Sequence, residues 1–200
     1  MLIVPSVDSL DSRKCANVSR ILRGFVSVIN LKLSPETKDV QSLLRVFNGL
    51  TAELEITIFD KDYDTKLVNL VSAHSDVNIG KVFFFTNDLA EVEQQITNVR
   101  IFGIQPGIIV TKENFKNIGV INKFEYGVIN AIDNENYLEI YKTVKENDFK
   151  GTLLLDFGNV KIPMEMLQNE SINGVYINVT DNPAIKDTIS TYRRIANSIY

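Results

Sequence analysis

The sequence predicts an α/β fold, a single (β/α)8 TIM barrel over residues 1–200. Two observations carry this prediction: short runs rich in β-forming residues recur eight times, and each run is followed by a polar loop and a segment of helical periodicity. An open doubly wound sheet shows the same alternation, but the count of eight favours a closed barrel. The eight runs are Leu2–Val7, Phe25–Leu31, Leu54–Phe59, Val82–Phe85, Gly107–Val110, Gly127–Ile129, Thr152–Leu155 and Gly174–Val179.

The first two units begin with continuous apolar runs, which are typical of parallel strands buried on both faces. After the first run, Ser9 or Asp11 can cap a helix that extends to Arg23. After the second run, Pro35 stands where a first helical turn tolerates proline. The sequence therefore predicts a strand and a helix in each unit.

The third and fourth units differ in the residues at the end of the strand. The third strand ends in Asp60-Lys61-Asp62-Tyr63-Asp64, the densest polar group at any predicted strand end. The fourth strand contains three consecutive phenylalanines, and Asn87 or Asp88 caps the next helix. Alternation of the phenylalanines between the barrel interior and the helix layer predicts a packing role for them.

The last four units have shorter helices and end in a strongly amphipathic one. The fifth helix is expected between residues 113 and 123, the sixth after Asp133, and the seventh from about Pro163. The final helix carries isoleucine and tyrosine at helical spacing from Ile185 to Ile199. The eighth predicted strand is therefore followed by a predicted helix, as the other seven are.

The amino-acid composition argues against several classes of function. The chain has 200 residues, 44% of them hydrophobic, and a net charge of −4, which argues against a general nucleic-acid or anionic-membrane surface. The lone Cys15 excludes an intramolecular disulfide and a cysteine-rich metal site. The first residues lack the basic and apolar regions of a signal peptide, and no stretch approaches about 18 apolar residues, so a cytoplasmic protein without a membrane partner is expected.

Three segments resemble orotidine 5′-phosphate decarboxylases. Residues 3–8 (Ile-Val-Pro-Ser-Val-Asp) are similar to the family's first strand, and residues 128–138 to its sixth-strand segment. Residues 174–183 are similar to its closing Gly-Arg-Ser-Ile-Tyr-x-x-Asp/Glu-Asn-Pro, with Asp-Asn-Pro kept at the end. The resemblance implies a barrel of the ribulose-phosphate-binding type, a homodimer, a phosphorylated substrate, and a lyase of pyrimidine biosynthesis that needs no metal or organic cofactor.

The resemblance also implies catalytic residues at the third strand. The family carries Asp-x-Lys-x-x-Asp there, and the matching residues imply Lys61 as the proton donor with Asp60, Asp64 and Asp8 as its electrostatic partners. If Lys61 and Asp64 match the pattern, Phe59 replaces the first aspartate, and if Asp60 matches the first aspartate, Asp62 stands at the lysine position. Either one member of the pattern is lost or the loop is shorter by one residue. A solvated loop with Asp64 as a helix cap is the alternative interpretation, and Asp8 can likewise cap a helix.

The phosphate site departs further from the family. Its arginine aligns with Val175, and its second-strand lysine has no match in the predicted strand, with Lys32 displaced toward the loop. Loop groups are therefore expected to hold the phosphate and the substrate. These groups are Gly158, Asn159, Lys161, Gly174 and Asn30.

Three questions stay open at this level. Asp156, at the end of the seventh strand, points either into the site or toward a loop amide. The chain is either an active decarboxylase-like enzyme or a catalytically degenerate barrel with a binding or structural role. Another phosphosugar lyase or isomerase on the same fold is the third possibility.

Overall fold

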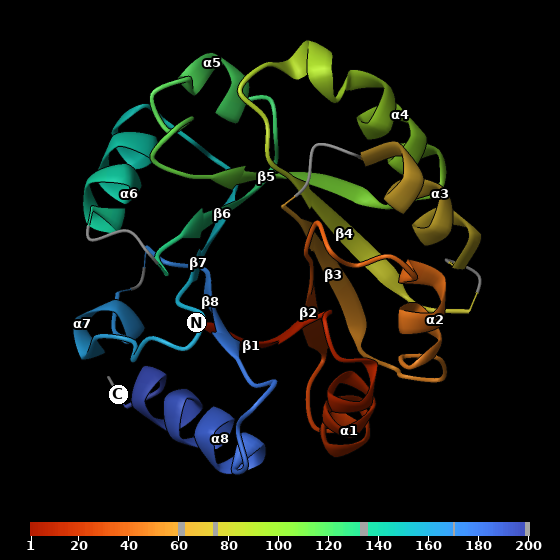
Figure 1. Cartoon of the computed structure of the whole chain (residues 1–200). Coiled ribbons are helices and arrows are strands. Elements are labelled where there is room, and N and C mark those ends of the chain that lie inside the picture. The colour runs from red at the N-terminus through yellow and green to blue at the C-terminus, as the bar shows by residue number, and fades with distance from the viewer. Residues whose placement is uncertain (60–62, 74–75, 133–135, 170, 199–200) are drawn as a thin grey trace.

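Eight parallel strands close into a barrel in chain order, with the last strand paired to the first. The computed structural model describes residues 1–59, 63–73, 76–132, 136–169 and 171–198. Figure 1 shows the ring of strands with the helices around its outside. The closed barrel confirms the predicted fold class. The strands are β1 (Leu2–Asp8), β2 (Val28–Leu33), β3 (Glu53–Ile58), β4 (Ile79–Phe84), β5 (Gln105–Val110), β6 (Tyr126–Asn130), β7 (Thr152–Asp156) and β8 (Gly174–Asn178).

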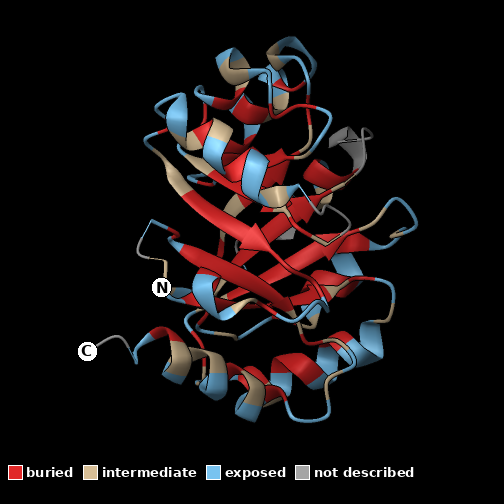
Figure 2. Cartoon of the chain, turned by 90° about the vertical axis from the view of Figure 1, so that its left-hand side faces the viewer, coloured by how far each residue is buried: buried red, intermediate tan, exposed pale blue. Residues whose placement is uncertain are grey.

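Helices connect consecutive strands and cover the outer surface of the barrel. Figure 2 shows buried strands inside, and helices that keep exposed residues on their outer faces. Within the described ranges, no helix is long and apolar enough to cross a membrane. The helices are α1 (Ser12–Leu22), α2 (Val40–Arg45), α3 (Tyr63–Ala73), the 3-10 helix η1 (Leu89–Glu91), α4 (Glu93–Ile101), α5 (Ile118–Ile121), α6 (Tyr137–Glu146), α7 (Met164–Leu167) and α8 (Ile185–Ala196).

For two helix caps the sequence allows alternatives, and the structure selects between them. Asp11 caps α1, because its carboxylate accepts from the backbone amides of residues 13 and 14. Asp88 caps η1 through the amide of Ala90. Ser9 instead bonds Thr37 across the mouth of the barrel.

Several predicted boundaries were wrong, and two of them affect the description of the site and the helices. The second strand begins at Val28 and not at Phe25, because the amide of Phe25 is still bonded to the carbonyl of Leu22 in the turn that ends α1. The strand then continues to Leu33, which includes Lys32. The fifth helix is only four residues long, because Asn114 closes a turn onto the amide of Thr111 instead of continuing a helix.

Two hydrophobic clusters divide the core. The larger lies between the strands and the helices. The smaller fills the barrel interior, where strand period two directs every second side chain. A glycine makes room in it: a Cβ on Gly107 would lie 2.5 Å from the Phe83 ring. The interior cluster consists of Val4, Phe83, Ile109, Val128, Leu154 and Tyr176.

Candidate functional site at the carboxyl end of the barrel

A buried ion pair crosses the barrel where the strands end. Lys32 of β2 places its Nζ atom 2.8 Å from Oδ1 and 2.7 Å from Oδ2 of Asp156 on β7. The side chains are only 7% and 1% exposed, respectively. Asp156 Oδ1 also accepts from the amide of Gly158 at 3.0 Å. Both interpretations of Asp156 therefore hold at once, since it points into the barrel and bonds a loop amide.

Sequence reasoning placed Lys32 in the loop, and this was wrong. Counting in steps of two from Val28 puts Val28, Asn30 and Lys32 on one face of β2. Asn30, which pairs in register with Ser6, and Lys32, which pairs with Asp8, both direct their side chains into the barrel. The signal was present in the sequence, but the predicted strand ended at Leu31, two residues before the end of β2, and so left Lys32 out.

Asp8 lies at the mouth beside β8. Its Oδ2 atom accepts from Asn178 Nδ2 at 2.6 Å, and its amide donates to Thr180 Oγ1 at 2.9 Å. The side chain is half-buried and caps no helix, because Asp11 caps α1. Asp8 is therefore available at the rim of the mouth, in register with Lys32.

The remaining predicted catalytic residues lie where the structure gives no side-chain description. Asp60 and Lys61 lie outside the described residues. Asp64 belongs to α3, and only its backbone is described. Their roles stay predictions.

Two of the predicted phosphate-binding residues line a cavity of about 310 Å³. Gly158 and Asn159 line it after β7, Asn178, Asp181 and Asn182 line it at the end of β8, and Thr188 and Tyr192 line it from α8. A positive φ of 53° at Gly158 lets the chain turn there, and a Cβ would lie 2.9 Å from Ile132.

The structure does not bring the other two to this cavity. Lys161 is exposed and is not among the described lining residues. Gly174 begins β8, at the opposite end of that strand. A Cβ on Gly174 would lie 2.8 Å from the carbonyl oxygen of Leu2, so close backbone packing explains the glycine.

The rim of this cavity is electrostatically balanced. Lys14 of α1 forms an ion pair with Asp181, so the carboxylate there does not stand alone. Helix α8 begins beside the cavity, and its N-cap residue Ala184 makes no side-chain capping bond. The amino end of a helix favours an anion.

A second charged network lies deeper in the barrel, and sequence reasoning missed it. Lys81 contacts Glu53 at 2.5 Å and Glu55 at 2.9 Å, and the hydroxyl of Tyr176 donates to Glu55. Burial, followed by the Glu55 carboxylate, raises the pKa of Tyr176 well above its usual range. Burial lowers the pKa of Lys81, but the two glutamates outweigh burial and raise it overall. The tyrosine stays neutral and the lysine stays charged.

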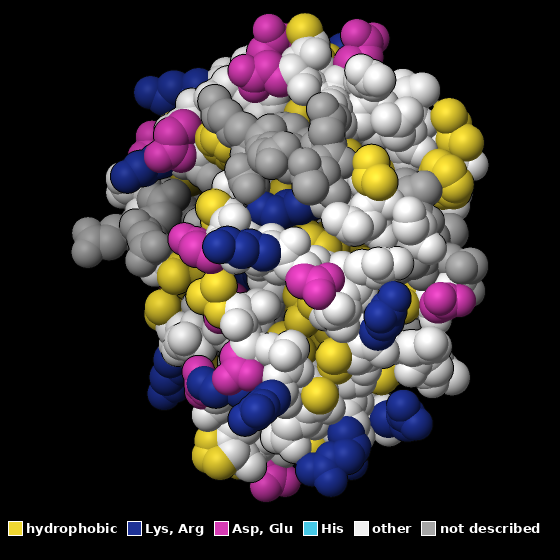
Figure 3. Space-filling model, turned by 45° about the vertical axis from the view of Figure 1, so that its right-hand side comes forward, with side chains coloured by type: hydrophobic (Ala, Val, Ile, Leu, Met, Phe, Trp, Pro, Cys, Tyr) yellow, Lys and Arg dark blue, Asp and Glu magenta, His cyan; other side chains and the backbone are white. Residues whose placement is uncertain are grey.

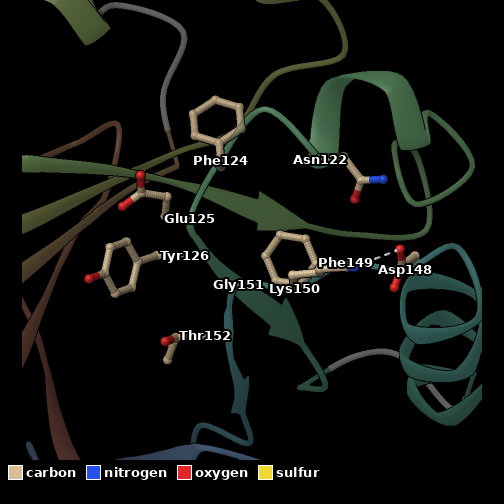
Figure 4. Close-up of a pocket in the computed structure, with 9 residues that line it drawn as sticks. All are labelled: Asn122, Phe124, Glu125, Tyr126, Asp148, Phe149, Lys150, Gly151 and Thr152. Atoms are coloured by element: carbon tan, nitrogen blue, oxygen red, sulfur yellow. Dashed lines mark ion pairs between the residues drawn. The ribbon is translucent and has the colours of Figure 1, made fainter.

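Another cavity lies at the other end of the barrel. Figure 4 shows this space of about 480 Å³ beside Tyr126 and Thr152, which begin β6 and β7. Asp148 and Lys150 form an exposed ion pair at its edge. Because barrel chemistry is placed at the carboxyl ends of strands, the smaller cavity, whose lining residue Gly158 bonds Asp156, is the stronger candidate.

Two further observations concern the charges on the surface and the grouping of possible metal ligands. Figure 3 shows Lys and Arg side chains interspersed with Asp and Glu over the face in view. Within the described ranges, no three His, Cys, Asp or Glu side chains are grouped so that they could hold a metal ion.

Comparisons with known proteins establish the fold. No protein-family model and no curated protein matches this chain. Two structures of mutant tryptophan synthase α-subunits from Pyrococcus furiosus match with TM-scores of 0.73 and 0.74, each at 10% identity over 98% of both chains. A structure of the tryptophan synthase α2β2 complex from the same organism matches at 0.67, with 10% identity over 97% of this chain and 95% of the other. The chain thus shares the (β/α)8 barrel fold of these structures.

Proposed function

We propose that this barrel binds a phosphorylated sugar or nucleoside at its carboxyl end and carries out cofactor-independent proton transfer on it, as a lyase or isomerase. The observation that carries the proposal is the buried Lys32–Asp156 pair. Burying two charges costs stability even when they are paired, and this pair lies at the end of the barrel where such folds place their chemistry. The tryptophan synthase α-subunits, whose fold the chain shares, make another enzyme on this fold a reasonable comparison.

The cavity beside β7 and β8 supplies the phosphate subsite in this proposal. Asn159 is exposed on one wall, the start of α8 lies on the other, and Lys14 neutralises Asp181. Asp156 links the subsite to the ion pair, because Gly158 both lines the cavity and donates to its carboxylate. A ligand anchored by its phosphate would therefore extend over the mouth toward Lys32.

Lys32 is suited to stabilise negative charge as it develops on such a ligand. An ammonium group has three N–H donors, and the two contacts to Asp156 engage at most two of them. The third can donate to a substrate oxygen or transfer its proton to carbon. In the lyase form, a bond to the reacting carbon breaks, its electron pair stays on that carbon, and the proton from Nζ forms the new C–H bond. Solvent then returns a proton to the neutral amine.

A second candidate is orotidine 5′-phosphate decarboxylation itself. The residues that carry the sequence resemblance favour it, because Asp181 and Asn182 line the cavity and Asp8 lies at the mouth. In this version Lys61 delivers the proton to the carbon that loses carbon dioxide, with Asp60, Asp64 and Asp8 around it. Carbon dioxide release from orotidine 5′-phosphate that survives Lys61→Ala would rule out that donor.

Thermal melting with added ligands tests the general proposal. Inorganic phosphate, ribose 5-phosphate and uridine 5′-phosphate are each titrated, and a ligand at a hundred times its Kd stabilises the native state by about 2.7 kcal/mol. Asn159→Asp should abolish the shift by repelling the phosphate, whereas Lys161→Met, outside the cavity, should leave it intact. If none of the three ligands shifts the midpoint, the degenerate barrel with a binding or structural role is the correct interpretation.

We further propose a cytoplasmic homodimer that covers the strand ends. Large apolar side chains are exposed in loops on this side: Leu10 after β1 and Val160 after β7. Sedimentation analysis should give twice the chain mass of 22.6 kDa. A Leu10→Lys variant that sediments as the wild type would place the interface elsewhere.

A further inference from the structure

Two polar side-chain atoms inside the barrel, one on β1 and one on β2, lack a hydrogen-bond partner within the described residues. Ser6 of β1 and Asn30 of β2 are register partners, and both are completely buried. Neither Ser6 Oγ nor Asn30 Oδ1 has a hydrogen-bond partner within the described part of the chain. Buried polar atoms are normally paired, so two unpaired atoms on adjacent strands indicate a place for an external group.

The orientation of the Asn30 amide is fixed by its neighbours. Its nitrogen lies 3.2 Å from the carbonyl oxygen of Glu55 and 2.8 Å from Thr57 Oγ1. A carbonyl oxygen can only accept, so the atom facing it must be the nitrogen and not the oxygen. The unpaired atom is therefore an acceptor, and the group that completes it must donate.

This requirement selects the chemistry of the group. A hydroxyl can donate its one hydrogen to Asn30 Oδ1 and at the same time accept from Ser6 Oγ. A carboxylate or a phosphate dianion can only accept, so it leaves Asn30 unpaired. A ligand ammonium would donate, but the ammonium of Lys32 on the same strand disfavours a second positive charge.

The pair lies below the proposed reaction centre. Ser6 precedes Asp8 and Asn30 precedes Lys32 by two residues, and a strand rises about 3.3 Å per residue, so the pair lies about 7 Å further back along these strands. Asn178 connects it to the phosphate subsite, because Asn178 pairs with Ser6 in register and lines the cavity.

We propose that Ser6 and Asn30 receive a hydroxyl group of the ligand, so that the barrel selects a phosphorylated polyol, such as a pentose phosphate, over a phosphate that carries no hydroxylated chain. The proposal rests on the proposed function, since it assigns the second anchoring point of the same site. Ser6 and Asn30 act as specificity residues, and the Lys32–Asp156 pair between them and the rim acts on the bound ligand.

Calorimetric titration of the wild type and Ser6→Ala with D-ribose 5-phosphate and with inorganic phosphate tests this. The wild type should bind ribose 5-phosphate at least tenfold more tightly than phosphate. Ser6→Ala should lose about that factor for ribose 5-phosphate and keep the phosphate affinity. Its unliganded melting midpoint should rise, because the substitution removes an unpaired buried hydroxyl.

Ser19→Ala is the matched control. Ser19 is also buried, but its hydroxyl donates to the carbonyl of Val46 on the outer side of the barrel. This variant should melt earlier and bind both probes as the wild type does.

Four results would overturn the inference. If phosphate binds but ribose 5-phosphate gains nothing over it, or if Ser6→Ala binds both as the wild type does, the hydroxyl receptor is wrong and the phosphate site stands. A lower midpoint for Ser6→Ala with unchanged affinities would show that Ser6 is purely structural. If the wild type binds neither probe, the proposed function fails and the inference fails with it.

Discussion

Removal of one partner of the ion pair in the barrel mouth should be costly. In Lys32→Met, the Asp156 carboxylate stays 1% exposed and loses two contacts of 2.7 and 2.8 Å. Breaking such a buried pair costs about 3–5 kcal/mol. The amide of Gly158 still solvates one oxygen, which places the expected loss near the lower end, about 3 kcal/mol. For a chain of this size, that loss lowers the melting midpoint by roughly 6–12 °C.

The double variant Lys32→Met/Asp156→Asn separates lost charge pairing from lost packing. The asparagine carries no charge and can still accept from Gly158, so urea unfolding should recover about 2 kcal/mol relative to the single variant. Lys14→Met, which removes an exposed partner of Asp181, should leave the midpoint unchanged. A loss below about 1 kcal/mol in Lys32→Met, or a double variant no more stable than the single one, would refute the buried pair.

Three further predictions concern the scaffold. Asp148 adopts a positive φ of 65° just after the end of α6, so Asp148→Gly should raise the free energy of unfolding, measured in urea, by about 1 kcal/mol. An unchanged free energy of unfolding would mean that no backbone strain is stored there. Gly107→Ala should lower the free energy of unfolding by about 1–3 kcal/mol, because its Cβ meets the Phe83 ring. Gly119→Ala, with open space around it, should raise the free energy of unfolding by about 0.5–1 kcal/mol. Equal effects of the two substitutions would contradict the packing. Burial raises the pKa of Cys15 from 9.0 to about 12, so its contribution to stability is complete below pH 9 and is lost as pH rises toward 12. Between pH 9 and pH 12, the unfolding free energy of the wild type should therefore fall more steeply than that of Cys15→Ala. Parallel pH profiles of the two proteins would contradict the raised pKa of Cys15.

The barrel was predictable because its signal is repeated. Each unit pairs a β-rich run with a helical segment, and eight repeats outweigh an error of a few residues in any one boundary. Such an error matters little for topology. It matters more for the site, because the end of β2 at Leu33 and not at Leu31 puts Lys32 in the barrel interior and not in a loop.

The contacts between side chains inside the barrel depend on its closure, so no short segment of the sequence predicts them. Glu55 and Tyr176 are 121 residues apart in sequence, and their bond forms only because β8 returns to β1. Lys32 and Asp156 are 124 residues apart and meet for the same reason. Period-two counting predicts which side chains point inward, but not which of them meet across the barrel.

The central claim is that the carboxyl end of the barrel, with Lys32 and Asp156 at its centre, binds a phosphorylated ligand. Calorimetric titration of ribose 5-phosphate into the wild type and into Lys32→Met/Asp156→Asn tests it most directly, because the double variant is expected to stay folded. We expect saturable binding to the wild type and at least tenfold weaker binding to the double variant. Equal affinity in the two proteins, or no heat of binding in the wild type, would contradict it.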